Sequence, residues 1–354
     1  MLSIRTPRAA IRTASISFGA ITIATSAHAH EAWLLTPDEI VALAMEPIPA
    51  IFTSYLVLGL AAVIGCIATM AALFVEEQVQ PIEARLEPAL QTAAFTVGPL
   101  VLRLGLANML ALAATGGLPR HGTAMWTQPT LLVPDMQLSL VPGWDLLVPL
   151  QIGIAILLVA GLFTRVIGAV LIGVVGIGLA VFGSKFMAYA PHFAAPALVL
   201  ILVGGGPWAL DQITGLSTRL TPRPAIRQAI WRLAQILVGG GFVYLAVVYK
   251  LTQPTLLIAI LQHGEMPTFG LSYPVIALIM TGVEIICGAL LIAGRLIRPV
   301  SLVIIGAITF LAVVLGETPL FHANLYGTML IFALAGRTLP ASISGPTELR
   351  RVAA

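Results

Sequence analysis

The sequence predicts an all-α polytopic membrane protein: one leading transmembrane helix followed by two tandem four-helix bundles. Charged residues make up only 9% of the 354 residues, whereas soluble domains carry about 25%. Hydrophobic residues reach 58%, the mean hydropathy is +1.00, and apolar runs of bilayer-spanning length recur along the chain. This composition excludes a soluble enzyme and a disordered chain. The lipid bilayer is therefore the predicted environment, and a net charge of +3 predicts no nucleic-acid partner.

Residues 1–29 have the pattern of a secretory signal peptide. Arg5, Arg8 and Arg12 form a basic region, a short apolar stretch covers residues 16–25, and Ala27-His28-Ala29 fits a cleavage site. Cleavage there would make His30 the first residue of the mature chain. The alternative is an uncleaved anchor or amphipathic arm, because the apolar stretch is short for a span.

Nine apolar stretches in the mature chain are long enough to be membrane-spanning helices, although several are short. The first belongs to region 30–90, which also contains a periplasmic N-terminal segment and an acidic cytoplasmic surface helix, residues 76–90, predicted to break near Pro81 and Pro88. The nine predicted spans are 50–75, 92–116, 146–163, 166–184, 189–208, 228–249, 271–293, 300–316 and 321–337.

The distribution of basic residues predicts the orientation of these spans. Arg120, Lys185 and Lys250 are the only basic residues in the loops assigned to the outside; the inside loops and tail hold ten arginines. Positive charge concentrates on the cytoplasmic side of membrane proteins. We therefore expect a multi-pass protein of the bacterial inner membrane whose N-terminus is periplasmic after signal cleavage.

An internal duplication divides most of the chain. The segment ending at Arg165 matches the segment ending at Arg298, and Gln151 falls on Glu284 at the same spacing. Arg103 and Arg232 begin equivalent spans at nearly that spacing. The predicted regions are a first unit at 91–210, a cytoplasmic linker at 211–227, a second unit at 228–340 and a cytoplasmic tail at 341–354.

The repeated residues resemble the DoxX-like family of four-helix membrane proteins. The second unit carries the resemblance best: Arg232, Lys250, Glu284 within an apolar helix, and the small-residue turn from Gly294 to Arg298. The first unit departs from the pattern, since Gln151 replaces the acid. Some members of the family resemble a subunit of a thiosulfate:quinone oxidoreductase, and relatives serve in the maturation of periplasmic redox enzymes.

Glu284 is the leading candidate for chemistry. A carboxyl within a span costs about 3 kcal/mol on insertion scales, so it persists only when paired, protonated or facing a cavity. It is a candidate for proton transfer or quinone contact, with Arg232 and Lys250 beside it in the candidate site. The structural alternative is an ion pair with Arg232 or another residue of the bundle.

The histidines of the mature chain all fall on the predicted outside face. Imidazole is a common transition-metal ligand and titrates near neutral pH. The candidate metal ligands are His30, His121, His192, His263 and His322. Glu317 with His322 is the most suggestive local pair. The alternative is that these are ordinary solvated loop residues.

Three functions follow from these patterns. The first is a membrane subunit or assembly factor of a quinone-linked redox system, with a periplasmic or membrane redox partner protein. The second is a periplasm-facing copper-handling protein, and the third is a small-solute transporter. Quinone and copper are accordingly the candidate cofactors.

Overall fold

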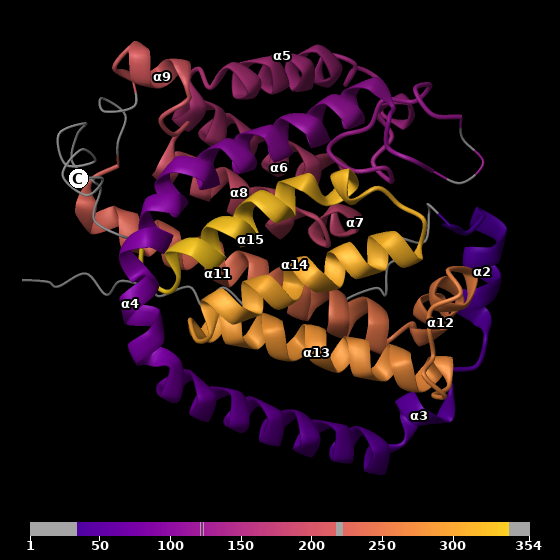
Figure 1. Ribbon diagram of the computed structural model, residues 1–354. Coiled ribbons are helices and arrows are strands. Elements are labelled where there is room, and N and C mark those ends of the chain that lie inside the picture. Colours follow the sequence, from indigo (N-terminus) through magenta and orange to yellow (C-terminus); the bar gives the residue numbers. More distant parts are fainter. Residues whose placement is uncertain (1–33, 121, 123, 217–221, 340–354) are drawn as a thin grey trace, which may run out of the picture.

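A computed structural model describes residues 34–120, 122, 124–216 and 222–339, and this part of the chain is all-α (Figure 1). The predicted signal peptide, His30, His121 and the tail 341–354 lie outside the described residues. The helices of eight or more residues are α2 (Pro37–Met45), α4 (Tyr55–Thr115), α5 (Leu147–Ala160), α6 (Thr164–Phe182), α8 (Ala190–Val203), α11 (Pro224–Tyr244), α12 (Pro254–His263), α13 (Tyr273–Ala293), α14 (Ile297–Val314) and α15 (Ala323–Ala335).

Short helical segments complete the described chain. They are α3 (Ala50–Thr53), the 3-10 turn η1 (Leu138–Leu140), α7 (Ser184–Met187), α9 (Leu210–Ile213), the π-helical segment η2 (Leu245–Leu251) and the 3-10 turn η3 (Pro319–His322). Among the described residues, five helices are long and apolar enough to cross a membrane: α4, α6, α11 with η2, α13 and α14. Helices α5, α8 and α15 are shorter, and they occupy the other predicted spans.

Helix α4 corrects the prediction of a broken segment at residues 76–90. Its 61 residues remain helical through Pro81, Pro88 and Pro99. Proline removes one backbone donor and crowds the preceding turn, so it can bend a helix without ending it. Figure 1 shows the consequence: α4 runs along the lower edge of the molecule, turns, and then crosses toward its upper part. One bent helix thus contains the predicted leading span, the acidic segment and the first span of the first unit.

The two repeated units interlock. The first unit consists of α4 from residue 92 onward, α5, α6 and α8; the second consists of α11 with η2, α13, α14 and α15. Within each unit the first helix packs on the second and the third on the fourth. Across the units, α4 packs along α15 and α11 packs along α8. The first helix of each unit therefore lies against the last helix of the other, and both units share one core.

Equivalent arginines hold equivalent helix ends. Arg103 donates to the carbonyls of Leu158 and Val159 at the end of α5, and Arg232 donates to those of Leu291 and Ile292 at the end of α13. The carbonyls bound by Arg103 and those bound by Arg232 are separated in the chain by the same number of residues as Arg165 and Arg298. Cationic side chains satisfy the free carbonyls and the negative dipole at helix C-termini. The two units therefore repeat these arginine–carbonyl contacts as well as the sequence pattern.

A second pair of arginines follows the same rule. Arg165 donates to the carbonyls of Ile201 and Leu202 at the end of α8. Arg298 donates to those of Leu334 and Ala335 at the end of α15, which are the equivalent positions of the second unit. These four arginines mark one end of the bundle, called here the arginine end. The opposite end holds His192, Lys250, His263 and His322 and is called the histidine end.

In each unit a carboxylate caps the N-terminus of the third helix. The two carboxylates come from different parts of the chain. Asp211 accepts hydrogen bonds from the backbone N–H of Phe163 at 2.7 Å and of Thr164 at 2.8 Å, where α6 begins. At the start of α14, Leu296 donates its N–H to Glu76 at 2.9 Å. Both caps place negative charge at a helix N-terminus. Because Glu76 belongs to α4 before residue 92, the leading helix completes the second unit.

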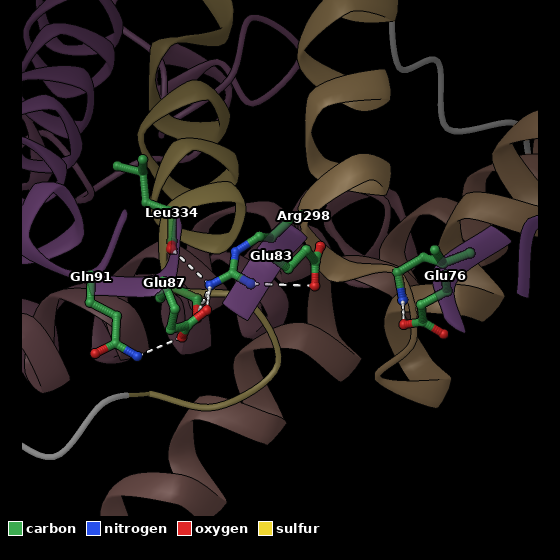
Figure 2. Close-up of polar contacts among 8 residues, drawn as sticks. Glu76, Glu83, Glu87, Gln91, Arg298 and Leu334 are labelled. Atoms are coloured by element: carbon green, nitrogen blue, oxygen red, sulfur yellow. Dashed lines mark hydrogen bonds and ion pairs between the residues drawn. The ribbon is translucent and has the colours of Figure 1, made fainter. Parts of the chain in front are cut away.

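The acidic segment of α4 also binds the turn before α14 (Figure 2). Glu76 forms an ion pair with Arg295 at 2.6 Å. Glu83 and Glu87 both point toward Arg298, Glu83 at 3.6 Å. The predicted surface helix is thus attached to the second unit through its carboxylates.

Candidate functional site

A cavity of about 210 Å³ lies at the histidine end of the second unit. Most of its wall is apolar. It comes from α8, α11 with η2, α12, α13, α14, η3 and α15, with Met109 of α4 and Val133 and Pro134 of the loop between α4 and α5 closing it. The polar residues on its wall are Tyr189, His192, Tyr249, Lys250, Glu284, Glu317, His322 and Asn324. A cavity of about 150 Å³ accommodates a benzene ring, so this one has room for a single substituted ring.

Lys250 and Glu284 form an ion pair on the cavity wall. The Lys250 Nζ atom lies 2.5 Å from Glu284 Oε2, and the side chains are 25% and 14% exposed. Lys250 belongs to η2, a π-helical continuation of α11. Such turns change the direction of side chains and occur often at functional sites. The remaining ammonium protons of Lys250 can still donate to a ligand, since an ammonium has three donors.

His192 is set into the junction of the two units. Its Nε2 atom is buried and has no hydrogen-bond partner among the described residues. The ring lies edge-on to Phe242 at 5.1 Å between centroids, and a Cβ added at Gly241 would come within 2.6 Å of Nε2. Asn324 fixes the backbone by donating to the His192 carbonyl at 3.0 Å. The glycine thus creates the space that the imidazole occupies.

Glu317 and His322 form a second acid–base pair on the wall. The Glu317 Oε2 atom lies 3.4 Å from His322 Nε2, and the Glu317 side chain is only 7% exposed. Its other oxygen, Oε1, is buried without a partner in the described part of the chain. Leaving a buried acceptor unsatisfied costs about 1–3 kcal/mol. A ligand that donates a hydrogen bond at this point would recover that cost.

The equivalent region of the first unit is filled. Gln151, at the position equivalent to Glu284, is fully buried. Its Oε1 atom accepts from the N–H of Leu132 at 3.1 Å, and its Nε2 atom donates to the carbonyl of Thr130 at 2.9 Å. These residues belong to a hairpin-like loop, residues 130–137, whose ends pair through Thr130 and Gln137. Leu131 and Leu132 of this hairpin are completely buried.

The hairpin 130–137 connects the two units. One side is bonded to Gln151, and its Val133 and Pro134 line the cavity of the second unit. Asp135 next to them accepts a hydrogen bond from the Tyr189 hydroxyl, and Tyr189 also lines the cavity. The longest loop at the histidine end is therefore a wall of the site.

The structure brings some predicted site residues together and separates others. Glu284, Lys250, His192 and His322 all line the cavity. Arg232 lies at the arginine end, where its contacts are Gln235 and helix carbonyls, so it is not part of this site. The structural alternative, an ion pair of Glu284 with Arg232 or another residue of the bundle, is confirmed with Lys250 as the partner. Arg232 is not the partner, because the helix places the two cations at opposite ends.

The predicted metal ligands are only partly described. His263 is exposed at the end of α12 and does not line the cavity, and His30 and His121 lie outside the described residues. No group of three or more His, Cys, Asp or Glu side chains that could hold a metal ion occurs within the described ranges. Of the predicted set, only His192 and His322 meet at one place.

Sequence reasoning missed Tyr189, Tyr249 and Asn324. Each is a single polar residue near a helix end and carries no motif. Their positions on the cavity wall depend on how α8, α11 and α15 meet across the two units.

No family model matches this chain, and neither the curated proteins nor the solved structures gave a match. The chemistry of the cavity is therefore the basis on which a function can be proposed.

Proposed function

We propose that this chain is a DoxX-like membrane subunit of a quinone-linked redox system, and that the cavity binds the ring of a quinone-type ligand. The observation that carries the proposal is the cavity itself: an apolar space for one ring with the Lys250–Glu284 pair on its wall. Ligand sites combine apolar walls with a few placed polar groups in this way. The duplicated four-helix plan and the positions of Lys250 and Glu284 also agree with the resemblance.

The proposed setting is the bacterial inner membrane, with the histidine end facing the periplasm. In this orientation the four arginines lie near the cytoplasm, which agrees with the distribution of positive charge in membrane proteins. The cavity would then open toward a periplasmic or membrane redox partner, which supplies or accepts the electrons.

Binding of a short-tailed quinone to the purified protein tests the proposal. Isothermal titration with ubiquinone-1 in detergent micelles should show one site per chain. Lys250→Met should weaken binding about tenfold, because a charge-assisted hydrogen bond contributes about 1.5 kcal/mol or more. Ala312→Phe should abolish binding, since Ala312 lines the cavity and a ring there would occupy it.

The matched control is Lys185→Met, which removes an exposed cation from α7 at the same end of the bundle. It should leave the affinity unchanged. Absence of binding of both ubiquinone-1 and its reduced form to the unaltered protein contradicts the proposal. In native membranes, Glu284→Gln should also impair quinone reduction that depends on this chain.

A further inference from the structure

We infer that the cavity selects the reduced, hydroxyl-bearing form of its ring ligand, a quinol, through Glu317. This inference rests on the proposed function and adds the redox state of the ligand and the residue that recognises it. Glu317 is nine-tenths buried, lines the cavity, and has an oxygen without a partner among the described residues.

The selectivity follows from donors and acceptors. An ionised carboxylate only accepts hydrogen bonds, and the two oxygens of a quinone are also only acceptors. A quinone oxygen at Glu317 would therefore leave Oε1 unsatisfied and place two lone pairs against each other. A quinol hydroxyl can donate to Oε1 instead.

Lys250, the ammonium on the cavity wall, does not oppose this preference. Lys250 is a donor, and one of its protons is already directed to Glu284. A quinol hydroxyl oxygen and a quinone carbonyl oxygen can both accept a hydrogen bond from an ammonium. Lys250 can therefore bind either redox form. Glu317 accepts a hydrogen bond only from the form with a proton to donate, so it distinguishes the two forms.

His322 keeps the Glu317 carboxylate in place. Its Nε2 lies on the Oε2 side at 3.4 Å, which leaves Oε1 as the oxygen for a ligand. Both residues follow α14 within a short stretch that includes η3, and both line the cavity.

Anaerobic titration of the full-length protein with ubiquinol-1 and ubiquinone-1 tests this inference. We expect the quinol to bind about tenfold or more tightly, the effect of one hydrogen bond to a charged acceptor. The dimethyl ether of the quinol has the same ring and no hydroxyl proton. It should bind no better than the quinone, and this comparison requires no protein variant.

Glu317→Gln provides the second test, because its amide can donate to a quinone carbonyl. The preference for quinol should disappear or reverse. Glu265→Gln, an exposed acid-to-amide change at the same end, should preserve the preference. Equal affinity of the unaltered protein for both forms overturns the inference and leaves the proposed quinone site intact. Binding of neither form overturns both.

Discussion

In the first unit, Gln151 is bonded to the hairpin 130–137, whereas in the second unit the equivalent Glu284 lies on the wall of an open cavity. Arginines at equivalent positions bind the carbonyls at the helix ends of both units. The difference lies in what fills the space at the histidine end. A shared backbone plan can therefore hold a structural core in one copy and a ligand site in the other.

Exchanging Gln151 and Glu284, the equivalent residues of the two units, should give the largest difference in stability cost between the units. Gln151→Glu removes the donor to Thr130 and places a carboxylate where no solvent reaches, so the free energy of unfolding should fall by about 3 kcal/mol or more. Glu284→Gln should cost only about 1 kcal/mol, because its partner Lys250 is partly exposed. Denaturant titration in a mild detergent measures both. Equal costs would contradict the division into a filled and an open unit.

Leucine truncation in the two units sharpens the same comparison. Leu131→Ala should lower the free energy of unfolding by about 3 kcal/mol, because Leu131 is fully buried in the hairpin. Leu257→Ala should cost about 2 kcal/mol, since this side chain already borders a cavity and makes fewer contacts there. Thermal unfolding of both variants provides the measurement. A larger loss for Leu257→Ala would mean that the second unit is the more tightly packed.

The two carboxylate caps should differ in strength. Asp211→Asn leaves an amide facing the Thr164 N–H and hydroxyl, and we expect a loss of about 2 kcal/mol. Glu76→Gln should cost about 1 kcal/mol, because this cap includes the exposed Arg295. Hydrogen exchange at the first turns of α6 and α14 should locate each effect. Loss of protection in the whole second unit after Glu76→Gln would show that the leading helix is essential to its fold.

The smallest expected effect concerns the ion pairs of Arg298. Its counterpart Arg165 has no carboxylate within 4.0 Å in the described part of the chain, while Arg298 has Glu83 and Glu87. Glu83→Gln should change stability by about 0.5 kcal/mol or less, because the contact is long and the Glu83 side chain is exposed. The change should disappear at high salt concentration. A salt-independent loss above about 1 kcal/mol would assign Glu83 a structural role.

Much of the fold followed from patterns that are local in sequence. The apolar runs predicted the all-α membrane class, and the constant spacing of the repeat predicted equivalent arginine turns, which make equivalent contacts. The continuity of α4 was not predicted, because Pro81 and Pro88 usually weaken a helix and the surrounding contacts decide whether it ends there. Sequence also identified Glu284 and Lys250 but did not pair them.

The sequence by itself determined that this is a membrane protein, and it determined the apolar segments and the internal repeat. Each of these depends only on composition and spacing along one chain. Only the tertiary structure decided which copy is filled and which is open. That outcome depends on where the hairpin 130–137 lies and on which helix of one unit packs against the other. Contacts between residues far apart in sequence separate Arg232 from Glu284 and bring Glu317, His322 and Lys250 to one cavity.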